Sequence, residues 1–253
     1  MTGRRAVLWG RIVLIAGTVA LLEVLCRTGI VDPLTLLPPS AMAAAMVAVI
    51  GSGSVTGDIL RTFSTVAIAF ALAVAFGIAA GALLHAAPRL RRALDPLLAS
   101  YYAVPLFVFY PLLVAVFGLN ALPLIVLGFA SATVAMALST LTGLDRTPRV
   151  LLKVARMHRL GRLRTALLVV LPAASPDLLT GLKLALAYAF IGIIAGEFIL
   201  SGSGLGYQIA YAYDSFDNRT MYGLMLFVLL VATGMNAALH IWEQRLLRRR
   251  MRA

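Results

Sequence analysis

The sequence contains few side chains that could carry out chemistry, and their spacing indicates no catalytic or metal centre. The three histidines, His85, His158 and His240, are scattered, so no metal-ligand cluster is predicted. Cys26 is the only cysteine, which excludes a disulfide framework. There is also no Ser-His pairing and no cluster of acidic residues. An enzyme is therefore a weak hypothesis for this chain.

A nucleotide site of the phosphate-loop kind is not expected either. Such a loop needs Gly-x-x-x-x-Gly-Lys-Ser/Thr, because its backbone amides surround the phosphates and its lysine neutralises them. The chain has two lysines, Lys153 and Lys183, and leucine precedes each of them. The glycine-rich stretch 201–206 contains no lysine and is more typical of a turn. We therefore expect no cofactor in this chain.

Two ionisable residues, Lys183 and Glu197, lie in otherwise apolar sequence. They are 14 residues apart, about 21 Å along a helix, so they cannot neutralise each other within one helix. Ionisable groups inside a membrane span usually face a cavity or a partner. The simpler interpretation is that Lys183 anchors one interface and that the Glu197 carboxylate reaches water at the other.

The composition shows what kind of structure must position these residues. Of 253 residues, 61% are apolar and 13% are charged, against about 45–50% and about 25% in ordinary soluble domains. A mean hydropathy of +0.95 over this length can be buried only in lipid. The net charge of +12 could suit nucleic acid, but the basic residues lie between apolar stretches, so no nucleic-acid partner is expected. A single membrane domain, residues 1–253, is predicted.

Intervals without charge define the membrane spans, because a spanning helix needs about 20 mostly apolar residues. The interval 96–144 is 49 residues long and must hold two helices, with prolines at 105 and 111 expected to kink the first of them. A short helix outside the membrane is expected over 40–50. The fold class is an all-α integral membrane protein with six transmembrane helices, over residues 6–26, 62–86, 96–117, 122–142, 176–200 and 220–242.

The basic residues predict the orientation of these spans. Lys and Arg near the ends of spans mark the cytoplasmic side, and 18 of the 22 fall on one side of the predicted membrane. Both termini and the loop 144–175 are therefore expected to face the cytoplasm. We predict a multi-pass protein of a bacterial inner membrane.

The loop 144–175 has the pattern of two amphipathic helices. Thr147 and Pro148 predict a helix start, basic residues recur at helical spacing, and Gly161 is expected to end the helix in the left-handed conformation. A second amphipathic stretch over 162–170 leads to Pro172, which is expected to break the helix. Periodicity alone leaves two interpretations open: a helix pair on the membrane surface, and a docking element for a soluble partner.

Part of this loop resembles the cytoplasmic EAA loop of the permease subunits of bacterial ABC importers. The pattern in that family is Glu-Ala-Ala, three residues, Gly, and then Leu-Pro about ten residues further on. The sequence has Gly161, nine residues, Leu171-Pro172 and then Thr180-Gly181-Leu182-Lys183. At the Glu-Ala-Ala positions it departs from the family, with Ala155, Arg156 and Met157 and no acidic residue. Arg156 or Arg159 is therefore expected to meet the partner surface instead.

A second and more specific match lies downstream. The stretch Ala195-Gly196-Glu197-Phe198, with the run 201–207 and then Phe216-Asp217, is similar to the branch that imports nitrate, sulfonates, taurine, bicarbonate or thiamine precursors. Pro111-Leu112 and Phe117-Gly118 agree with it as well. The resemblance covers about residues 36 to 250. It does not identify the substrate, which in such importers a separate binding protein selects.

The resemblance implies a type I ABC importer permease fold and a division of labour between chains. Two copies of this chain would pair in the lipid bilayer, two ABC ATPase subunits carrying ATP and Mg would dock under a helix at 148–161, and an extracytoplasmic substrate-binding protein would deliver the solute. The residues expected to couple to the ATPase are Ala155, Arg156, Met157, His158, Arg159, Gly161 and Pro172. The residues expected near the translocation pathway are Tyr101, Tyr102, Phe109, Lys183 and Glu197.

The main alternative is a secondary transporter or channel that works without an ATPase. Such a protein would show internal repeats, matching broken helices and several acidic residues in mid-span. The sequence has no corresponding halves, and Glu23 and Glu197 lie near the ends of spans. Co-purification of an ATPase would separate the two hypotheses.

Overall fold

The structure is a computed structural model that describes residues 2–32, 35–101 and 104–250, and every regular element among them is a helix. The long helices are α1 (Thr2–Arg27), α3 (Thr56–Ala86), α6 (Ala121–Asp145), α9 (Leu171–Leu200) and α11 (Asn218–Arg250). The shorter ones are α2 (Pro39–Gly51), α4 (Pro88–Ser100), η2 (Leu106–Phe109), α5 (Tyr110–Phe117), α7 (Arg149–Met157), α8 (Arg162–Thr165), η3 (Ala166–Val170) and α10 (Leu205–Asp214).

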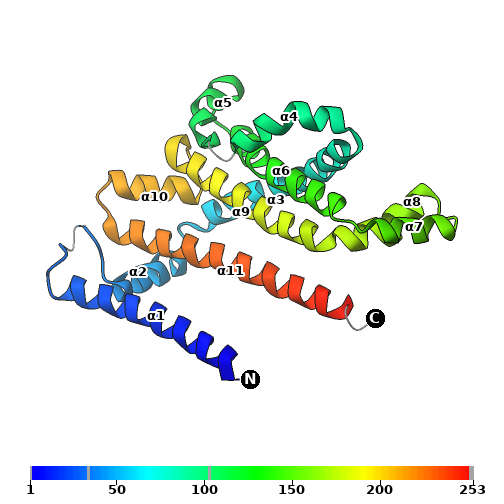
Figure 1. Cartoon of the computed structure of the whole chain (residues 1–253). Helices are drawn as coiled ribbons and strands as arrows, with labels where there is room; N and C mark the ends of the chain where they lie inside the picture. The colour runs from blue at the N-terminus through cyan, green and yellow to red at the C-terminus, as the bar shows by residue number, and fades with distance from the viewer. Residues whose placement is uncertain (1, 33–34, 102–103, 251–253) are drawn as a thin grey trace.

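Helix α6 forms the centre of the structure and packs between α3 and α9 (Figure 1). Small residues let these helices approach closely. A methyl group on Gly81 of α3 would lie 2.6 Å from the Thr140 Cβ of α6, and one on Gly181 of α9 would lie 2.7 Å from the Ser139 Cβ. Such close approach is typical of helix packing in membranes, where dispersion contacts replace the hydrophobic effect.

The remaining long helices expose most of their side chains. Few of the described side chains of α1 and α11 are fully buried although both helices are apolar, and α2 packs against α11. Leu14 and Leu229 are examples of large carbon side chains on these open surfaces. Surfaces of this kind are suited to lipid or to another membrane chain.

The two ends of the bundle carry different short helices (Figure 1). We call them the α7 end, where α7 and α8 lie, and the α10 end. Helix α1 begins and α11 ends on the side of α7 and α8. Five helices are long and apolar enough to cross a membrane, among the described residues, and they include five of the six predicted spans.

The predicted third span, 96–117, is not one continuous helix. Helix α4 ends at Ser100, and η2 begins at Leu106. Pro105 lies between them in an extended conformation, because its ring fixes φ and it has no N–H to donate. Pro111 falls in the first turn of α5, where a proline is well tolerated. Pro105 therefore interrupts this span and Pro111 does not, whereas kinks were expected at both.

The break expected at Pro172 does not occur. The chain runs in helical conformation from α8 through η3 into α9, and Pro172 stands in the first turn of α9. The preceding η3 is a π-helix, whose wider turn moves the carbonyl groups that a proline ring would otherwise meet. The helix that contains the fifth predicted span therefore begins before residue 176.

Replacing Gly81 by alanine should loosen the contact between α3 and α6. The new methyl group would press on Thr140 and on the Ala137 carbonyl, and overpacking of this kind costs about 1–3 kcal/mol. Gly17→Ala in α1 is the matched control, since nothing lies within 4 Å of the added methyl group. Thermal unfolding of the purified chain in detergent measures both variants. Equal midpoints for Gly81→Ala and Gly17→Ala would contradict the packing described here.

Candidate functional site

Helix α7 is an exposed amphipathic helix that packs against η3. Ala155 is 2% exposed, whereas Val150 is 67% and Met157 82% exposed. The N-cap is Pro148 in an extended conformation, not Thr147 as the sequence suggested. Thr147 is buried, and its hydroxyl donates a 3.2 Å hydrogen bond to the Gly143 carbonyl at the end of α6. The start of α7 is thus fixed to α6.

The end of α7 is closed by Arg159, which adopts the left-handed conformation at φ +52°. The Leu160 N–H donates to the Ala155 carbonyl at 3.0 Å, and the Arg159 N–H donates to the Arg156 carbonyl at 3.0 Å. This pair of bonds is the Schellman arrangement that ends many helices. His158 stands just before it as the C-cap.

The prediction that Gly161 would be the left-handed residue is wrong. Gly161 is extended, with φ −64° and ψ 162°, and it serves as the N-cap of α8. A methyl group added to it would meet nothing within 4 Å. The left-handed residue lies two positions earlier because α7 ends at Met157, before the glycine is reached.

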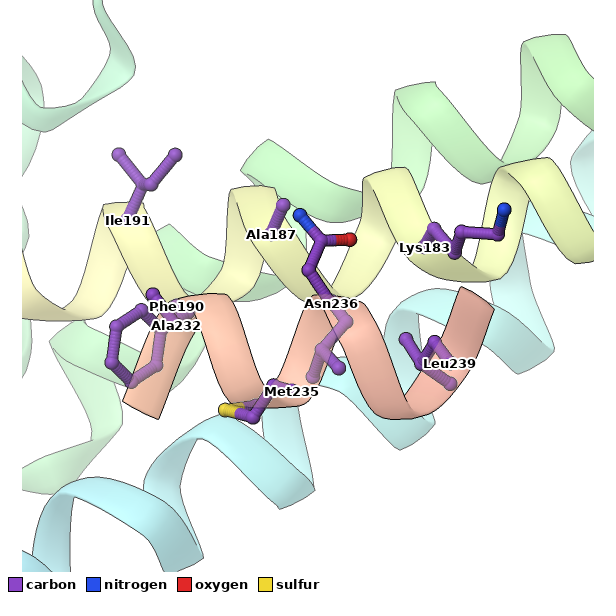
Figure 2. Close-up of a pocket in the computed structure, with 9 residues that line it drawn as sticks. Lys183, Ala187, Phe190, Ile191, Ala232, Met235, Asn236 and Leu239 are labelled. Carbon is purple, nitrogen blue, oxygen red and sulfur yellow. The ribbon is translucent and has the colours of Figure 1, made fainter. Parts of the chain in front are cut away.

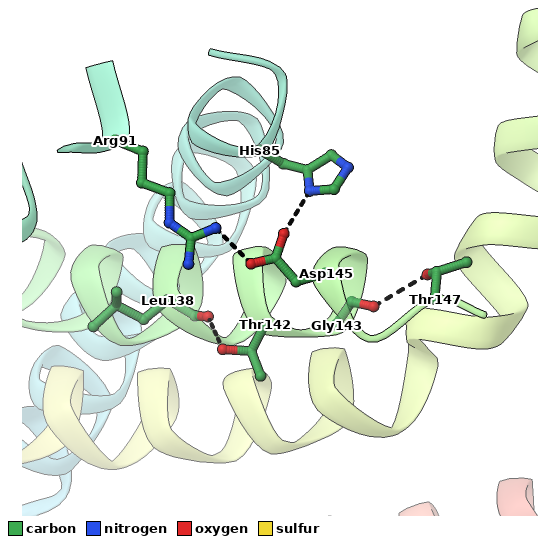
Figure 3. A network of polar contacts seen from close by, with 7 residues as sticks. All are labelled: His85, Arg91, Leu138, Thr142, Gly143, Asp145 and Thr147. Carbon is green, nitrogen blue, oxygen red and sulfur yellow. Dashed lines mark hydrogen bonds and ion pairs between the residues drawn. The ribbon is translucent and has the colours of Figure 1, made fainter. Parts of the chain in front are cut away.

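A polar cluster fixes the end of α6 at the base of this loop (Figure 3). Asp145 accepts a 2.6 Å hydrogen bond from the Arg91 guanidinium of α4 and lies 2.8 Å from the His85 Nδ1 of α3. The next residue, Arg146, forms a 2.8 Å ion pair with Asp177 of α9. Three neighbouring helices are therefore tied to the point where α7 departs.

A second polar cluster lies at the α10 end, around Glu197 of α9. Its carboxylate accepts a 2.8 Å hydrogen bond from the Thr62 hydroxyl of α3 and a 2.9 Å bond from the Gly206 N–H of α10. Glu197 is 1% exposed. The expectation that this carboxylate reaches water is therefore wrong.

The glycine-rich run 201–206 is held by the same cluster. Asp58 of α3 accepts a 2.6 Å bond from the Gly204 N–H and a 2.7 Å bond from the Gln208 amide, and the Leu205 N–H donates to Thr62 at 2.9 Å. Gly204 has φ +109°, and a side chain there would overlap the Glu197 carboxylate. Two carboxylates thus satisfy the amides at the N-terminus of α10, where the helix dipole favours negative charge. We call Asp58, Thr62, Glu197 and residues 204–208 the α10 cluster.

Lys183 forms an ion pair with Glu243 of α11 and has an exposed fraction of about a fifth. It also lines a cavity of about 160 Å³ between α9 and α11. In Figure 2, Lys183 lies at one end of this cavity and Phe190 at the other, with Asn236 between them. The sequence analysis missed this pairing, although a lysine and a glutamate in two apolar spans were a usable signal.

Among the described residues expected near a pathway, Tyr101 and Lys183 line different cavities. The Tyr101 hydroxyl donates to the Ser131 carbonyl of α6. Phe109 is about half exposed in η2. Tyr102 lies outside the described residues.

Comparison with known proteins agrees with this architecture. Residues 73–253 match the family described as binding-protein-dependent transport system inner membrane component. The chain belongs to this family. It is a transport permease component of the inner membrane and not an enzyme, and its six predicted spans include five found as long apolar helices in the described chain.

Three relatives of this permease component represent the expected branch. The nitrate import permease NrtB of Leptolyngbya laminosa is 32% identical over 74% of this chain and 68% of its own length. The taurine transport permease TauC of Escherichia coli is 25% identical over 86% of this chain and 81% of its own. The aliphatic sulfonates permease SsuC of Bacillus subtilis, itself described as putative, is 28% identical over 90% and 83%.

Solved structures show the fold of this permease component. A chain of the inward-facing MetNI methionine ABC transporter matches with a TM-score of 0.61 at 17% identity, covering 77% of this chain and 94% of that one. A second crystal form of the same transporter gives 0.62 at 18% identity, over 76% and 94%. The fold is that of a type I ABC importer permease.

Removing the Glu197 side chain should destabilise the α10 end. In Glu197→Ala, the Gly206 N–H and the Thr62 hydroxyl lose their buried acceptor, which costs about 1–3 kcal/mol for each unsatisfied group. Asp95→Ala, on the exposed surface of α4, is the control and should change stability by less than about 0.5 kcal/mol. Thermal unfolding in detergent measures both, and a Glu197→Ala midpoint equal to that of the control would show that the cluster is not stabilising.

Replacing Arg159 by glycine should stabilise the end of α7. Glycine adopts the left-handed conformation without the penalty of a Cβ, a gain of about 1 kcal/mol. Hydrogen exchange of the amides that close the helix, at 159 and 160, should slow by about fivefold. Gly161→Ala is the control and should leave exchange unchanged. If Gly161→Ala changes hydrogen exchange more than Arg159→Gly does, then Gly161 and not Arg159 is the left-handed residue.

Proposed function

We propose that this permease component forms, with a second copy, the translocation pathway of an ATP-driven importer, and that two separate ATPase subunits dock at α7. The observation that carries the proposal is the exposure of α7 together with the way it is attached to the rest of the chain. The helix is exposed on one side, its start is hydrogen-bonded to the end of α6, and it packs against η3, which leads into α9. An element of this kind can receive a push from a soluble partner and pass it to the membrane helices.

The docking surface consists of carbon side chains flanked by positive charge. Val150, Val154 and Met157 are exposed at a spacing of four and three residues, so they share one face of α7. Arg149, Lys153 and Arg156 are exposed on the same helix. We propose that Met157 fills a pocket on the ATPase and that Arg156 meets an acidic group there.

The other residues expected to couple have structural roles in this proposal. Ala155 is the buried residue of α7, while His158 and Arg159 close its end. Arg156 is exposed on α7 itself, whereas Arg159 follows the end of the helix, so we propose Arg156 for the contact that the family's glutamate would make. Gly161 is the N-cap of α8 and Pro172 lies in the first turn of α9. In this proposal, both residues shape the segment that leads from α7 back into the membrane.

Motion of α7 would reach the core through the polar cluster at Asp145. The ion pairs of Asp145 and Arg146 join α6 to α4 and to α9 in the same turn that leads into α7. A displacement of α7 would therefore move several spans together, as alternating access requires. ATP and Mg would be bound by the partner ATPase, and this chain would hold no cofactor.

We propose that the α7 end faces the cytoplasm and that both termini lie there. The excess of basic residues at this end supports the orientation. The α10 end would then face outward, where an extracytoplasmic binding protein delivers the solute. The bilayer and a second copy of the chain would cover the open surfaces of α1, α9 and α11.

The substrate class follows from chemistry that the named relatives share. Nitrate, taurine and aliphatic sulfonates are the solutes in their names. Each is small and carries an anionic group whose charge lies on oxygen atoms. We propose an oxyanion of this size as the solute of this permease, with Tyr101 and Phe109 near its path.

A double substitution on α7 tests the docking surface. Val150→Ser with Met157→Ser should lower the recovery of a co-expressed ATPase subunit by about tenfold, because burying two such side chains contributes at least 1–2 kcal/mol. Leu90→Ser, on exposed α4, is the matched control. Pull-down in neutral detergent excludes anionic lipid. Unchanged recovery with the double variant would leave α7 as a membrane-surface helix only.

Cysteine labelling tests the orientation. In a Cys26→Ala background, cysteines replacing Ser54 and Ser215 at the α10 end should react with an impermeant maleimide in right-side-out vesicles, because both positions are exposed. A cysteine replacing Ala166 of η3 should react only after the vesicles are opened. The reverse pattern would overturn the assigned orientation.

A further inference from the structure

Helices α9 and α11 leave a long groove between them. The cavity that contains Lys183 is also lined by Phe190, Ile191 and Ala232, and these three residues line a second cavity of about 590 Å³ as well. The two cavities therefore adjoin and form one groove, which we call the α9–α11 groove. Along α9 it runs from Lys183 to Ile199, a distance of 16 residues or about 24 Å.

The polar groups of the α9–α11 groove are gathered at its α7 end. Lys183 forms its ion pair with Glu243 there, and the His240 Nδ1 lies 3.4 Å from the Glu243 carboxylate. Asn236 is exposed in the groove, and among the described residues nothing forms a hydrogen bond with its amide. In Figure 2 it lies between Lys183 and Phe190. The other described residues that line the groove have apolar side chains.

This order of groups matches the layers of a bilayer. Lys183 is 17 residues from Leu200, where α9 ends, which is about 26 Å along the helix, against a hydrocarbon core of about 30 Å. Lys183 therefore stands near one boundary of the core. Ile191, about 12 Å further along α9, stands near the midplane. The first part of the groove thus spans about one leaflet and offers polar groups only on the headgroup side.

We infer that the α7 end of this groove binds a phospholipid whose headgroup carries a primary amine. The Lys183 ammonium donates to the phosphate, the lipid amine donates to the Glu243 carboxylate, and the Asn236 amide donates to a glycerol ester carbonyl. One acyl chain lies along Phe190 and Ile191. The lipid belongs to the leaflet at the α7 end, and only the naming of that leaflet as cytoplasmic rests on the proposed function.

The ion pair selects the headgroup. Lys183 and Glu243 present opposite charges side by side, and a phosphate joined to an ammonium presents the complementary pair. Lysine has three N–H donors, so Lys183 can bind the phosphate without leaving Glu243. A glycerol headgroup brings no positive charge to Glu243, and a choline headgroup has no N–H to donate.

The Asn236 amide favours a lipid over a second copy of the chain as the occupant. The carbon walls alone would suit a helix of another copy. An amide without a partner in hydrocarbon is costly, however, and the ester carbonyls of a phospholipid lie at the depth where Asn236 needs an acceptor. The bound lipid would also join α11 to α9 at the α7 end.

Lipid titration of the purified chain in detergent, followed by native mass spectrometry, tests the headgroup. Dioleoyl phosphatidylethanolamine should bind with a Kd about fivefold lower than that of the phosphatidylglycerol or phosphatidylcholine with the same chains. Lys183→Gln combined with Glu243→Gln keeps a hydrogen-bonding pair but removes both charges, so this double variant should lose the preference. Equal binding of the three lipids by the parent chain would overturn the headgroup assignment.

Single substitutions in the groove test the site. Asn236→Leu should raise the Kd for phosphatidylethanolamine about fivefold, as expected for one lost hydrogen bond. Thr233→Leu is the matched control, because Thr233 is exposed on the same helix outside the lining. Ala187→Trp should fill the cavity of about 160 Å³ and block binding, whereas Ala237→Trp, on the exposed surface of α11, should not.

Thermal unfolding without added lipid checks that each variant is folded, and either groove variant suffices for the test. Lipid binding that neither Asn236→Leu nor Ala187→Trp weakens would overturn the site. Loss of pairing between two copies in Ala187→Trp, with lipid binding unchanged, would assign the groove to the second copy instead. These measurements need no ATPase and no solute, so their failure would leave the proposed function standing.

Discussion

The close approach of α6 to α3 and α9 is the constraint on which the rest of the structure depends. Lipid tails are as apolar as leucine, so membrane helices gain little from burying carbon and must gain from close contact. Gly81 and Gly181 remove the side chains that would separate the helices at these crossings. The three helices then form one packed unit, and the more loosely attached α1 and α11 lie at its edge.

The polar groups of this unit are concentrated at its two ends, where they attach the segments that must meet other proteins. At one end, Asp145 and Arg146 bind three neighbouring helices at the base of α7. At the other, Glu197 and Asp58 hold the start of α10. In the proposed importer, a push on α7 would therefore move the core and the α10 end as one body, and the solute would pass beside it.

The spans could be predicted from the sequence because charge is excluded from lipid, and five of them are found as long helices. The contacts of single residues could not be predicted from the sequence. Glu197 is buried because Thr62, 135 residues earlier in the chain, supplies its hydrogen bond. Gly161 was a reasonable choice for the left-handed position, but α7 ends at Met157, and Arg159 adopts that conformation instead. Pro105 was visible in the sequence, yet only the structure shows that it is extended and stands at the start of η2.

The most direct test of the account is solute uptake into proteoliposomes that contain either this chain alone or this chain with its ATPase subunits and binding protein. The account predicts uptake only in the complete assembly, only with ATP inside the compartment that the α7 end faces, and without any requirement for an ion gradient. Uptake by the chain alone, driven by a proton or sodium gradient, would contradict it and would identify a secondary transporter instead.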